Sequence, residues 1–253
     1  AAQRIVAPFF IAACARSIIA RARFDVQSDG VRLVHGESDG LPGLIVDRYG
    51  DTLVAQFTAC GVERWKAPIA DALIELTGCP RLYERSDTSS RKLEGLPEVT
   101  GWQRGSGETA FELLEHGWRL GLDIAQGHKT GYYLDQRDSR LALYQYTKRL
   151  GFAQVLNCFS YTGGFSVAAL AGGAGHVTSI DSSGPALEQA RANLLLNGLD
   201  PAQATFMDAD VNTSLRQFVA EGRTFDAIVP DPPKFAPTAA HAERAARAYK
   251  DMN

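Results

Sequence analysis

The sequence predicts an α/β protein in which a small α+β domain over residues 25–119 precedes a doubly wound, mostly parallel sheet over residues 120–253. After residue 120, short apolar runs alternate with helical segments, which is typical of parallel sheets covered by helices. Before it, short β-like runs are separated by turn signals, which indicates hairpins. The 253 residues, 45% apolar and 22% charged, exclude a disordered chain.

The first 24 residues predict a basic helix. This alanine-rich stretch contains Arg4, Arg16, Arg21 and Arg23 and no acidic residue. Segments rich in arginine and poor in acids are also typical of transit peptides. We interpret residues 1–24 instead as a linker helix that follows an upstream domain.

In the α+β domain the sequence predicts five strands and one helix. The strands are expected at residues 31–34, 44–46, 53–57, 111–114 and 118–122. Short turn sequences at 47–51 and 115–117 join two pairs of these strands and predict two hairpins. The helix is expected over 63–76, where apolar residues have helical spacing, and Gly78 ends it.

In the C-terminal domain helices and strands alternate. In chain order we expect a helix at 139–150, a strand at 153–156, a helix at 165–171, a strand at 176–180, a helix at 185–197, and strands at 204–207 and 225–229. Pro185 suits the first turn of its helix, and Gly198 ends that helix. The four apolar strands predict a parallel sheet. Pro230 is expected only to shorten the fourth strand.

Chemistry-bearing residues follow each of the four strands. The first strand runs into a glycine turn over residues 157–165, and Asp181 ends the second. Asp208 and Asp210 follow the third strand, and Pro-Asp-Pro-Pro-Lys-Phe at 230–235 follows the fourth. Taken singly, these features have structural explanations: a tight turn, a helix cap, a solvated acidic loop or a stiff loop. Together they indicate a ligand crevice, because parallel strands all end at one edge of their sheet.

The residue types in this crevice suit an adenosyl cofactor. Glycines at a strand-to-helix turn let a ligand approach the backbone and a helix N-terminus. An acid about 20 residues later, here Asp181, can accept hydrogen bonds from two ribose hydroxyls. The spaced glycines of nicotinamide dehydrogenases are missing. The order of glycine turn, acid, acid and Asp-Pro-Pro resembles that of S-adenosylmethionine-dependent methyltransferases.

Longer motifs make this resemblance more specific. They are GHKTGYYLDQRDSR at 127–140, NCFSYTGGF at 157–165, DPPKF at 231–235, GESDGLPG at 36–43, RSD at 85–87, RKLEG at 91–95 and YKDMN at 249–253. With them, residues 24–253 resemble the bacterial 23S ribosomal RNA 5-methylcytosine methyltransferase family. The resemblance implies a Rossmann-like class I methyltransferase fold, here incomplete, with S-adenosylmethionine as cofactor and 23S ribosomal RNA as substrate. It also implies an upstream RNA-binding PUA domain, to which residues 1–24 would connect.

The resemblance also implies roles for single residues. Asp181 would hold the ribose, and Asp210, better aligned than Asp208, the adenine. Asp231 would lie beside the cofactor and face the target base. The other implied cofactor contacts are Tyr133, Gln136, Arg137, Phe159, Tyr161, Thr162, Gly163, Gly164 and Ser182. The implied catalytic residues are Asp231, Pro232 and Lys234, and no metal is expected.

Methylation at carbon 5 of cytosine needs a thiolate that adds to carbon 6, and a base that later removes the proton from carbon 5. Cys158 lies in the cofactor turn, where a small buried residue is the simpler interpretation. Cys14, Cys60 and Cys79 lie outside the catalytic domain. The family's thiol lies in a Ser-Cys-Ser motif that we expect beyond Asn253, so this chain is predicted to lack its nucleophile.

Composition restricts the partners. The net charge is −3, so RNA contacts must come from local groups, for which the candidates are Arg16, Arg21, Arg23, Arg91 and Lys92. The four cysteines form no CxxC pair, which argues against zinc or disulfides and fits a reducing cytoplasm. No apolar run approaches the roughly 18 residues of a membrane span. The oligomeric state stays open, with a homodimer as one candidate.

Two other functions stay open. A base amino-group methyltransferase uses a related Asn/Asp-Pro-Pro-aromatic turn and needs no thiol, although Lys234 takes the aromatic position here. A non-catalytic RNA-binding fragment would carry the same motifs. The atom that gains a methyl group from labelled cofactor distinguishes the two enzymes.

Overall fold

The computed structural model describes residues 6–233 and 242–250, which fall into two compact units. The first unit comprises Ala1–Gly117 and Gly121–Asp135, and the second comprises Trp118–Leu120 and Gln136–Asn253. An α+β region thus precedes a parallel sheet, and the predicted α/β class is confirmed. No helix in the described ranges has both the length and the apolar character that crossing a membrane requires.

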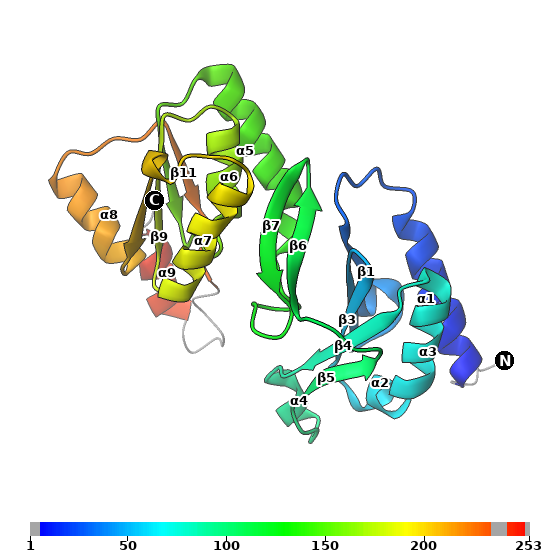
Figure 1. Ribbon diagram of the computed structural model, residues 1–253. Coiled ribbons are helices and arrows are strands. Elements are labelled where there is room, and N and C mark those ends of the chain that lie inside the picture. The colour runs from blue at the N-terminus through cyan, green and yellow to red at the C-terminus, as the bar shows by residue number, and fades with distance from the viewer. Residues whose placement is uncertain (1–5, 234–241, 251–253) are drawn as a thin grey trace. The chain divides into compact units, whose positions relative to one another are not determined.

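The first unit is built on a five-stranded sheet in the order β1-β2-β3-β4-β5 (Figure 1). Its strands are β1 (Gly30–His35), β2 (Leu44–Tyr49), β3 (Thr52–Phe57), β4 (Arg81–Ser86) and β5 (Val99–Arg104). Neighbours are antiparallel except β3 and β4, which are parallel. Two helices, α2 (Cys60–Arg64) and α3 (Lys66–Thr77), form the crossover between those two strands. The predicted β2–β3 hairpin is confirmed.

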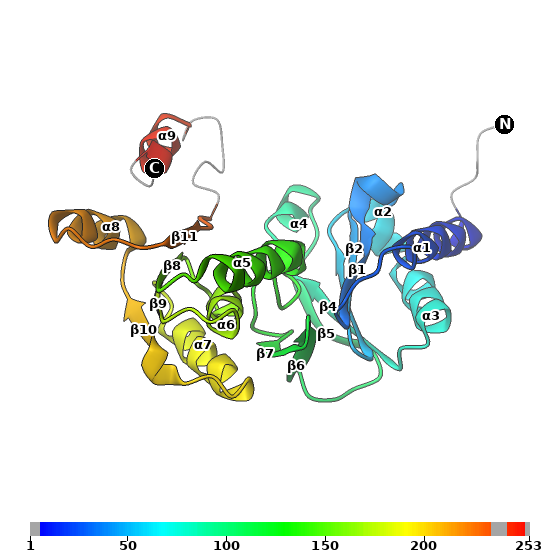
Figure 2. The same cartoon turned by 90° about the horizontal axis from the view of Figure 1, so that it is seen from above.

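One face of this sheet carries the apolar core of the first unit. Helix α1 (Ala7–Arg21) lies beside α3, as Figures 1 and 2 both show. Phe10 and Cys14 of α1 and Leu73 of α3 are buried against strand residues such as Leu44. The predicted N-terminal helix therefore belongs to the core of this unit, while its role as a connector stays a prediction.

Several elements of the first unit depart from the expected pattern. The predicted helix over 63–76 is two helices, because Trp65 leaves helical geometry with φ −107° and ψ 15°. The strands β4 and β5 and the short helix α4 (Ser90–Leu93) were not predicted.

The second predicted hairpin is present as β6 (Ala110–Glu115) and β7 (Trp118–Asp123). Its turn has positive φ at both His116 and Gly117, the geometry that two-residue hairpins prefer.

The second unit contains a parallel sheet in the order β10-β9-β8-β11. Its elements are α5 (Arg137–Leu150), β8 (Gln154–Cys158), α6 (Gly164–Ala171), β9 (His176–Asp181), α7 (Gly184–Leu196), the 3₁₀ turn η3 (Pro201–Gln203), β10 (Ala204–Asp208), α8 (Val211–Ala220), β11 (Ala227–Pro230) and α9 (Ala242–Lys250). The chain winds outward from β8 in one direction to β9 and β10, then crosses to β11 on the other side of β8. This reversal is the switch point of a doubly wound sheet.

Helices pack on both faces of the parallel sheet (Figure 2). On one face Leu156, Cys158 and Ile180 pack with Val211 and Phe218 of α8. Helices α6 and α7 pack on the strands from the other side, and α5 packs on α6. The fourth strand was expected at 225–229, but β11 begins only at Ala227 and includes Pro230, which pairs in register with Cys158, so Pro230 does not shorten the strand.

Candidate functional site

Most predicted ligand residues of the second unit lie at or just after the carboxyl ends of the four parallel strands. Cys158 at the end of β8 is paired in register with Ile180 of β9 and with Pro230 of β11. Asp181 of β9 is paired with Asp208 of β10. The glycine turn, both acidic positions and the Asp-Pro-Pro turn therefore start from neighbouring points along one sheet edge.

The turn between β8 and α6 has an unusual backbone. Phe159, Tyr161 and Gly163 all have positive φ, at 54°, 47° and 75°. A Cβ at Gly163 would lie 2.6 Å from the Cβ of Ala190 in α7, so both the conformation and the close approach require glycine. Gly164 then begins α6. The result is a tight turn that presents backbone atoms and a helix N-terminus at the sheet edge.

Two buried groups that were not predicted hold this turn. The side-chain amide of Asn193 in α7 donates to the carbonyl oxygen of Thr162 at 2.8 Å, and Asn193 is fully buried. Beneath the turn, Asn157 Nδ2 donates to Ser166 Oγ, which is 2.8 Å from Ser179 Oγ. The sequence signal for Asn193 is that it is the one polar residue on the otherwise apolar buried face of α7.

Asp181 connects the turn to the next helix. One carboxylate oxygen accepts a hydrogen bond from the backbone N–H of Tyr161 at 2.8 Å, and the other accepts one from Ser183 at 3.0 Å. Each carboxylate oxygen has a second lone pair, so these bonds leave acceptor capacity for two ribose hydroxyls. Ser182, the other predicted contact at this strand end, is exposed.

The two acids after β10 differ in their surroundings. Asp208 is exposed, and one of its oxygens would lie 3.1 Å from a Cβ at Gly184, the first residue of α7. Asp210 is the N-cap of α8, where Oδ1 accepts from the backbone N–H and the hydroxyl of Thr213, both at 2.8 Å. These bonds lower the pKa of Asp210 below its usual value, the backbone bond contributing most.

The remaining predicted residues that the structure describes lie after β11, at the start of α5 and in the first unit. Asp231 and Pro232 directly follow β11, and Asp231 is exposed. Lys234 lies outside the described residues. Gln136 occupies the N-cap position of α5 and Arg137 is its first residue, both in the second unit. Tyr133 belongs to the first unit, where its hydroxyl is 3.2 Å from Nδ1 of His128.

The chemistry of the turn suits a polar ligand. Ser160 Oγ and Thr162 Oγ1 are buried and have no hydrogen-bond partner within the described residues. Buried hydroxyls without partners are costly, and a bound group with polar atoms would satisfy them. In the same ranges, no group of three or more His, Cys, Asp or Glu side chains could hold a metal ion.

The buried cysteines are poorly suited to nucleophilic attack. Cys158 is 1% exposed, and its burial raises the pKa of its thiol to about 12. Burial raises the pKa of Cys14 to the same value. Only a thiolate is an effective nucleophile, and reactive cysteines have a lowered pKa. Cys60, which is exposed, lies at the start of α2 in the first unit.

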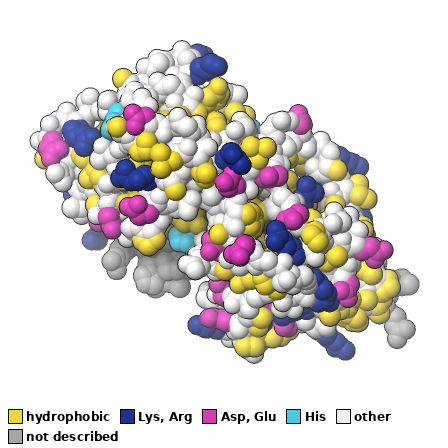
Figure 3. Space-filling model, in the orientation of Figure 1, with side chains coloured by type: hydrophobic (Ala, Val, Ile, Leu, Met, Phe, Trp, Pro, Cys, Tyr) yellow, Lys and Arg dark blue, Asp and Glu magenta, His cyan; other side chains and the backbone are white. Residues whose placement is uncertain are grey.

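One predicted RNA contact is wrong. Arg91 is fully buried, donating to the carbonyl oxygens of Phe57 and Pro97 and pairing with Glu63 at 2.8 Å. It therefore stabilises the first unit and cannot reach a phosphate. Its neighbour Lys92 is exposed. On the face drawn in Figure 3, basic and acidic side chains are interspersed over the described residues.

Comparisons with known proteins agree in the class of protein that they find. The S-adenosylmethionine-dependent methyltransferase family matches residues 89–247. Ribosomal RNA large subunit methyltransferase I of Klebsiella pneumoniae (strain 342) is 49% identical over 226 residues, 89% of this chain and 56% of that protein. The chain therefore spans about half the length of the curated relatives it matches.

Solved structures of proteins described as methyltransferases also match this chain. A crystal structure of a protein described as a methyltransferase, complexed with SAH, matches with a TM-score of 0.82 and 28% identity, covering 94% of this chain and 61% of that one. A protein from Streptococcus mutans described as SAM-dependent matches with a TM-score of 0.81 and 26% identity, covering 98% and 65%. Both cover the first unit as well as the second.

Proposed function

Because the chain belongs to the S-adenosylmethionine-dependent methyltransferase family, we propose that it binds S-adenosylmethionine at the carboxyl ends of β8–β11 and serves in methylating carbon 5 of a cytosine in bacterial 23S ribosomal RNA. The observation that carries the cofactor site is the Asp181 carboxylate bonded to the glycine turn. The RNA substrate is supported by the name of the 49% identical relative. The choice of carbon 5 rests on the motif resemblance.

Different residues of the chain would bind different parts of the cofactor. The backbone of Phe159–Gly164 would hold the methionine part, with Ser160 and Thr162 hydroxyls near it. Asp181 would accept from the ribose hydroxyls, and Asp210 from the adenine amino group through the oxygen that does not cap α8. Gln136 and Arg137, at the start of α5, would close the pocket. When bound, the cofactor supplies an electrophilic methyl group.

The target base would lie beside the Asp231-Pro232 turn. A carboxylate such as Asp231 can accept a hydrogen bond from the cytosine amino group, and the rigid prolines fix its position. By resemblance, Lys234 would also take part in catalysis. An enzyme acting on a base atom needs that base unpaired or flipped out of its stack. We therefore propose that the substrate is a single-stranded or opened segment of 23S RNA, methylated in the cytoplasm.

The thiolate is proposed to come from residues outside this sequence. It would add to carbon 6, carbon 5 would then take up the methyl group, and removal of the carbon-5 proton would expel the thiolate and restore the ring. Cys158 is a poor candidate for this step, because burial holds its thiol protonated with a pKa of about 12. Residues 1–253 alone would therefore bind the cofactor without completing the reaction.

Methyl-tritiated S-adenosylmethionine tests the proposal directly. The full-length protein that contains this chain is incubated with unmodified 23S RNA, and the RNA is digested to nucleosides. We expect the label in 5-methylcytidine. Label on an exocyclic amino group would instead support a base amino-group methyltransferase, and RNA without label would reject the proposed substrate.

A further inference from the structure

Helix α7 presses directly on the turn that is proposed to hold the methionine part of the cofactor. A Cβ at Gly163 would lie 2.6 Å from the Cβ of Ala190, which leaves no space between this helix and the turn. Three residues further along α7, the buried Asn193 amide donates to the carbonyl oxygen of Thr162 at 2.8 Å. Residues three apart lie on one face of a helix, and closely packed elements transmit displacements to each other. The position of this face of α7 therefore sets the position of the turn.

A row of amide side chains continues from Asn193 to the end of α7. Asn197, one helical turn later, donates from Nδ2 to the Asn193 carbonyl oxygen at 2.7 Å. The backbone N–H of Asn197 bonds to Leu194 instead, so the side chain supplies a donor that the end of a helix lacks. Gln189, one turn earlier, donates to Oδ1 of Asn193 at 3.1 Å. Three amides spaced four residues apart thus meet at Asn193.

The Asn197 side chain also binds a strand of the same unit. Its Oδ1 accepts a hydrogen bond from the backbone N–H of Arg119 at 2.9 Å, and Nδ2 donates to the Arg119 carbonyl oxygen at 2.7 Å. Arg119 lies in the part of β7 that belongs to the second unit, where Trp118 packs edge-on against Tyr144 of α5 with 5.6 Å between ring centroids. A side-chain amide has one oxygen and two N–H groups, and all of them are used here.

Hydrogen bonds therefore lead from β7 through Asn197 and Asn193 to Thr162 in the cofactor turn. Capping the helix needs only the bond from Asn197 to the Asn193 carbonyl, and the two bonds to Arg119 add a link to another element. We propose that Asn197 is a positioning residue for the cofactor turn, because it fixes the last turn of α7 on β7 and so keeps Asn193 on Thr162. This inference rests on the proposed function, since it assumes that the turn binds S-adenosylmethionine.

The test replaces the Asn197 amide in the full-length protein that contains this chain. Asn197→Asp keeps an oxygen for the Arg119 N–H, but a carboxylate cannot donate and would face two carbonyl oxygens. Asn197→Ala removes the same bonds without adding a charge. In both variants we expect faster amide hydrogen exchange in residues 158–165 without cofactor. We also expect the Kd for S-adenosylmethionine to rise about three- to tenfold, the equivalent of one net hydrogen bond.

Three measurements separate a displaced turn from partial unfolding. In calorimetry, unfolded protein lowers the number of binding sites, whereas a displaced turn raises the Kd. In methyl-transfer assays, a displaced turn should raise the KM for S-adenosylmethionine and leave kcat within about twofold of wild type. Finally, the double variant Asn193→Ala with Asn197→Ala should bind the cofactor no more weakly than Asn193→Ala alone, because members of one hydrogen-bond network are not additive. Losses that simply add would overturn the positioning role.

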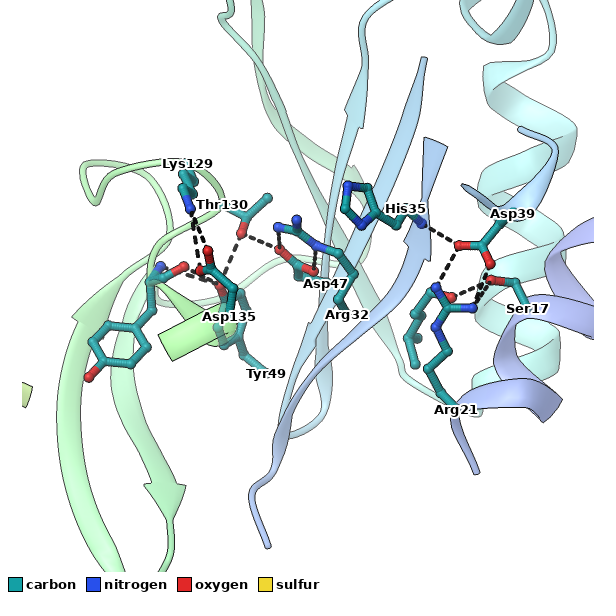
Figure 4. Close-up of polar contacts among 12 residues, drawn as sticks. Ser17, Arg21, Arg32, His35, Asp39, Asp47, Tyr49, Lys129, Thr130 and Asp135 are labelled. Atoms are coloured by element: carbon teal, nitrogen blue, oxygen red, sulfur yellow. Dashed lines mark hydrogen bonds and ion pairs between the residues drawn. The ribbon is translucent and has the colours of Figure 1, made fainter. Parts of the chain in front are cut away.

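Two aspartates serve as control positions. Asp200→Asn changes a residue close to Asn197, and its amide oxygen can still accept the bond that caps the η3 turn. Asp39→Asn removes the charge that pairs with Arg21 in the first unit, at 2.5 and 2.6 Å (Figure 4). Both should leave the turn's exchange and the Kd at wild-type values. Equal effects of Asn197→Asp and Asp200→Asn, or unchanged exchange of the turn in Asn197→Asp, would overturn the positioning role. If the wild-type protein bound no S-adenosylmethionine, the proposed function itself would fail instead.

Discussion

The Asp181 carboxylate at the end of β9 accepts a hydrogen bond from the backbone N–H of Tyr161, with 2.8 Å between the oxygen and the nitrogen. Tyr161 lies in the turn after the neighbouring strand and has a positive φ of 47°. The acid assigned to the ribose therefore also holds the turn assigned to the methionine part. Substitutions at Asp181 must therefore be chosen so that the loss of the ribose contact can be told apart from the loss of the bond to the turn.

Asp181→Ala should weaken S-adenosylmethionine binding by about 1.5–3 kcal/mol, the range for hydrogen bonds to a charged group. Asp181→Asn keeps an oxygen that can accept from Tyr161 but replaces the other with a donor, so it should also lose affinity while the turn stays intact. Calorimetry on the full-length protein measures both. Asp200→Ala is the control, because Asp200 caps only the short η3 turn. Unchanged affinity in Asp181→Ala would refute the ribose assignment.

Gly163→Ala should destabilise the second unit by about 2–4 kcal/mol, because it adds a left-handed alanine and a contact with Ala190. Gly173→Ala provides the comparison, since Gly173 also has a positive φ but a Cβ there would meet nothing within 4 Å. Urea unfolding should show a smaller loss for Gly173→Ala. Equal losses would mean that backbone strain alone, without the Ala190 contact, explains the requirement for glycine.

The parallel sheet could be predicted because its strands are short apolar runs between turn signals. β4 could not, since half of its residues are charged. Glu84 in this strand is fully buried and is paired with Lys66 at 2.8 Å, and Arg85 is satisfied by carbonyls about 40 residues away in sequence. A local pattern does not show partners that only the fold brings close.

The same reason limits what could be predicted of the site. Acids and glycines at strand ends were predictable, because a parallel sheet gathers them at one edge. The role of Asn193 was not, since it depends on α7 passing over Thr162. Arg91 stands beside Lys92 in a short basic motif, which by itself suggests an RNA contact. Its burial follows from acceptors at Phe57, Glu63 and Pro97, which the sequence alone does not bring together.

Arg91→Ala should destabilise the first unit by about 3–5 kcal/mol, because it leaves the buried carbonyl oxygens of Phe57 and Pro97 without their donor and removes one of the two cations paired with Glu63. Lys92→Ala should leave the free energy of unfolding within about 0.5 kcal/mol of wild type, as for most surface substitutions. Denaturant unfolding of the two variants measures this difference. Similar stabilities would contradict the structural role of Arg91.

The Lys92→Ala variant also tests whether Lys92 contacts RNA. If Lys92 touches phosphate, this variant should reduce the slope of log affinity for RNA against log salt concentration by about one.

Asp210→Ala should cost about 1 kcal/mol at neutral pH through loss of the α8 cap. The bond from Thr213 lowers the pKa of Asp210 in the folded protein below its usual 3.8. The stabilisation is therefore complete above the unfolded pKa and is lost as the pH falls through the folded pKa. The difference in free energy of unfolding between wild type and Asp210→Ala should shrink below about pH 4. A difference that stays constant down to about pH 2 would show that the carboxylate is not what stabilises α8.

Asp210→Asn distinguishes the cap from the adenine contact. Its amide oxygen can still accept from Thr213, so the stability of α8 should be retained. Its amide nitrogen, however, is a donor, and it would face the adenine amino group, which is also a donor. We expect near-wild-type unfolding with weaker S-adenosylmethionine binding. Wild-type affinity in this variant would transfer the adenine assignment to Asp208.

The 253-residue chain should not methylate carbon 5 of cytosine. The reaction needs a thiolate against carbon 6, and Cys158, the one cysteine at the described strand ends, is buried with a thiol pKa raised to about 12. The exposed Cys60 should react with a thiol reagent much faster than the buried Cys14, Cys79 and Cys158. The assay places this chain and the full-length protein side by side with unmodified 23S RNA and labelled cofactor. If this chain alone transferred the methyl group to carbon 5, and Cys158→Ser abolished that transfer, the prediction would be wrong. The buried thiol of Cys158 would then become reactive when RNA binds, and the nucleophile would be a residue of the cofactor turn.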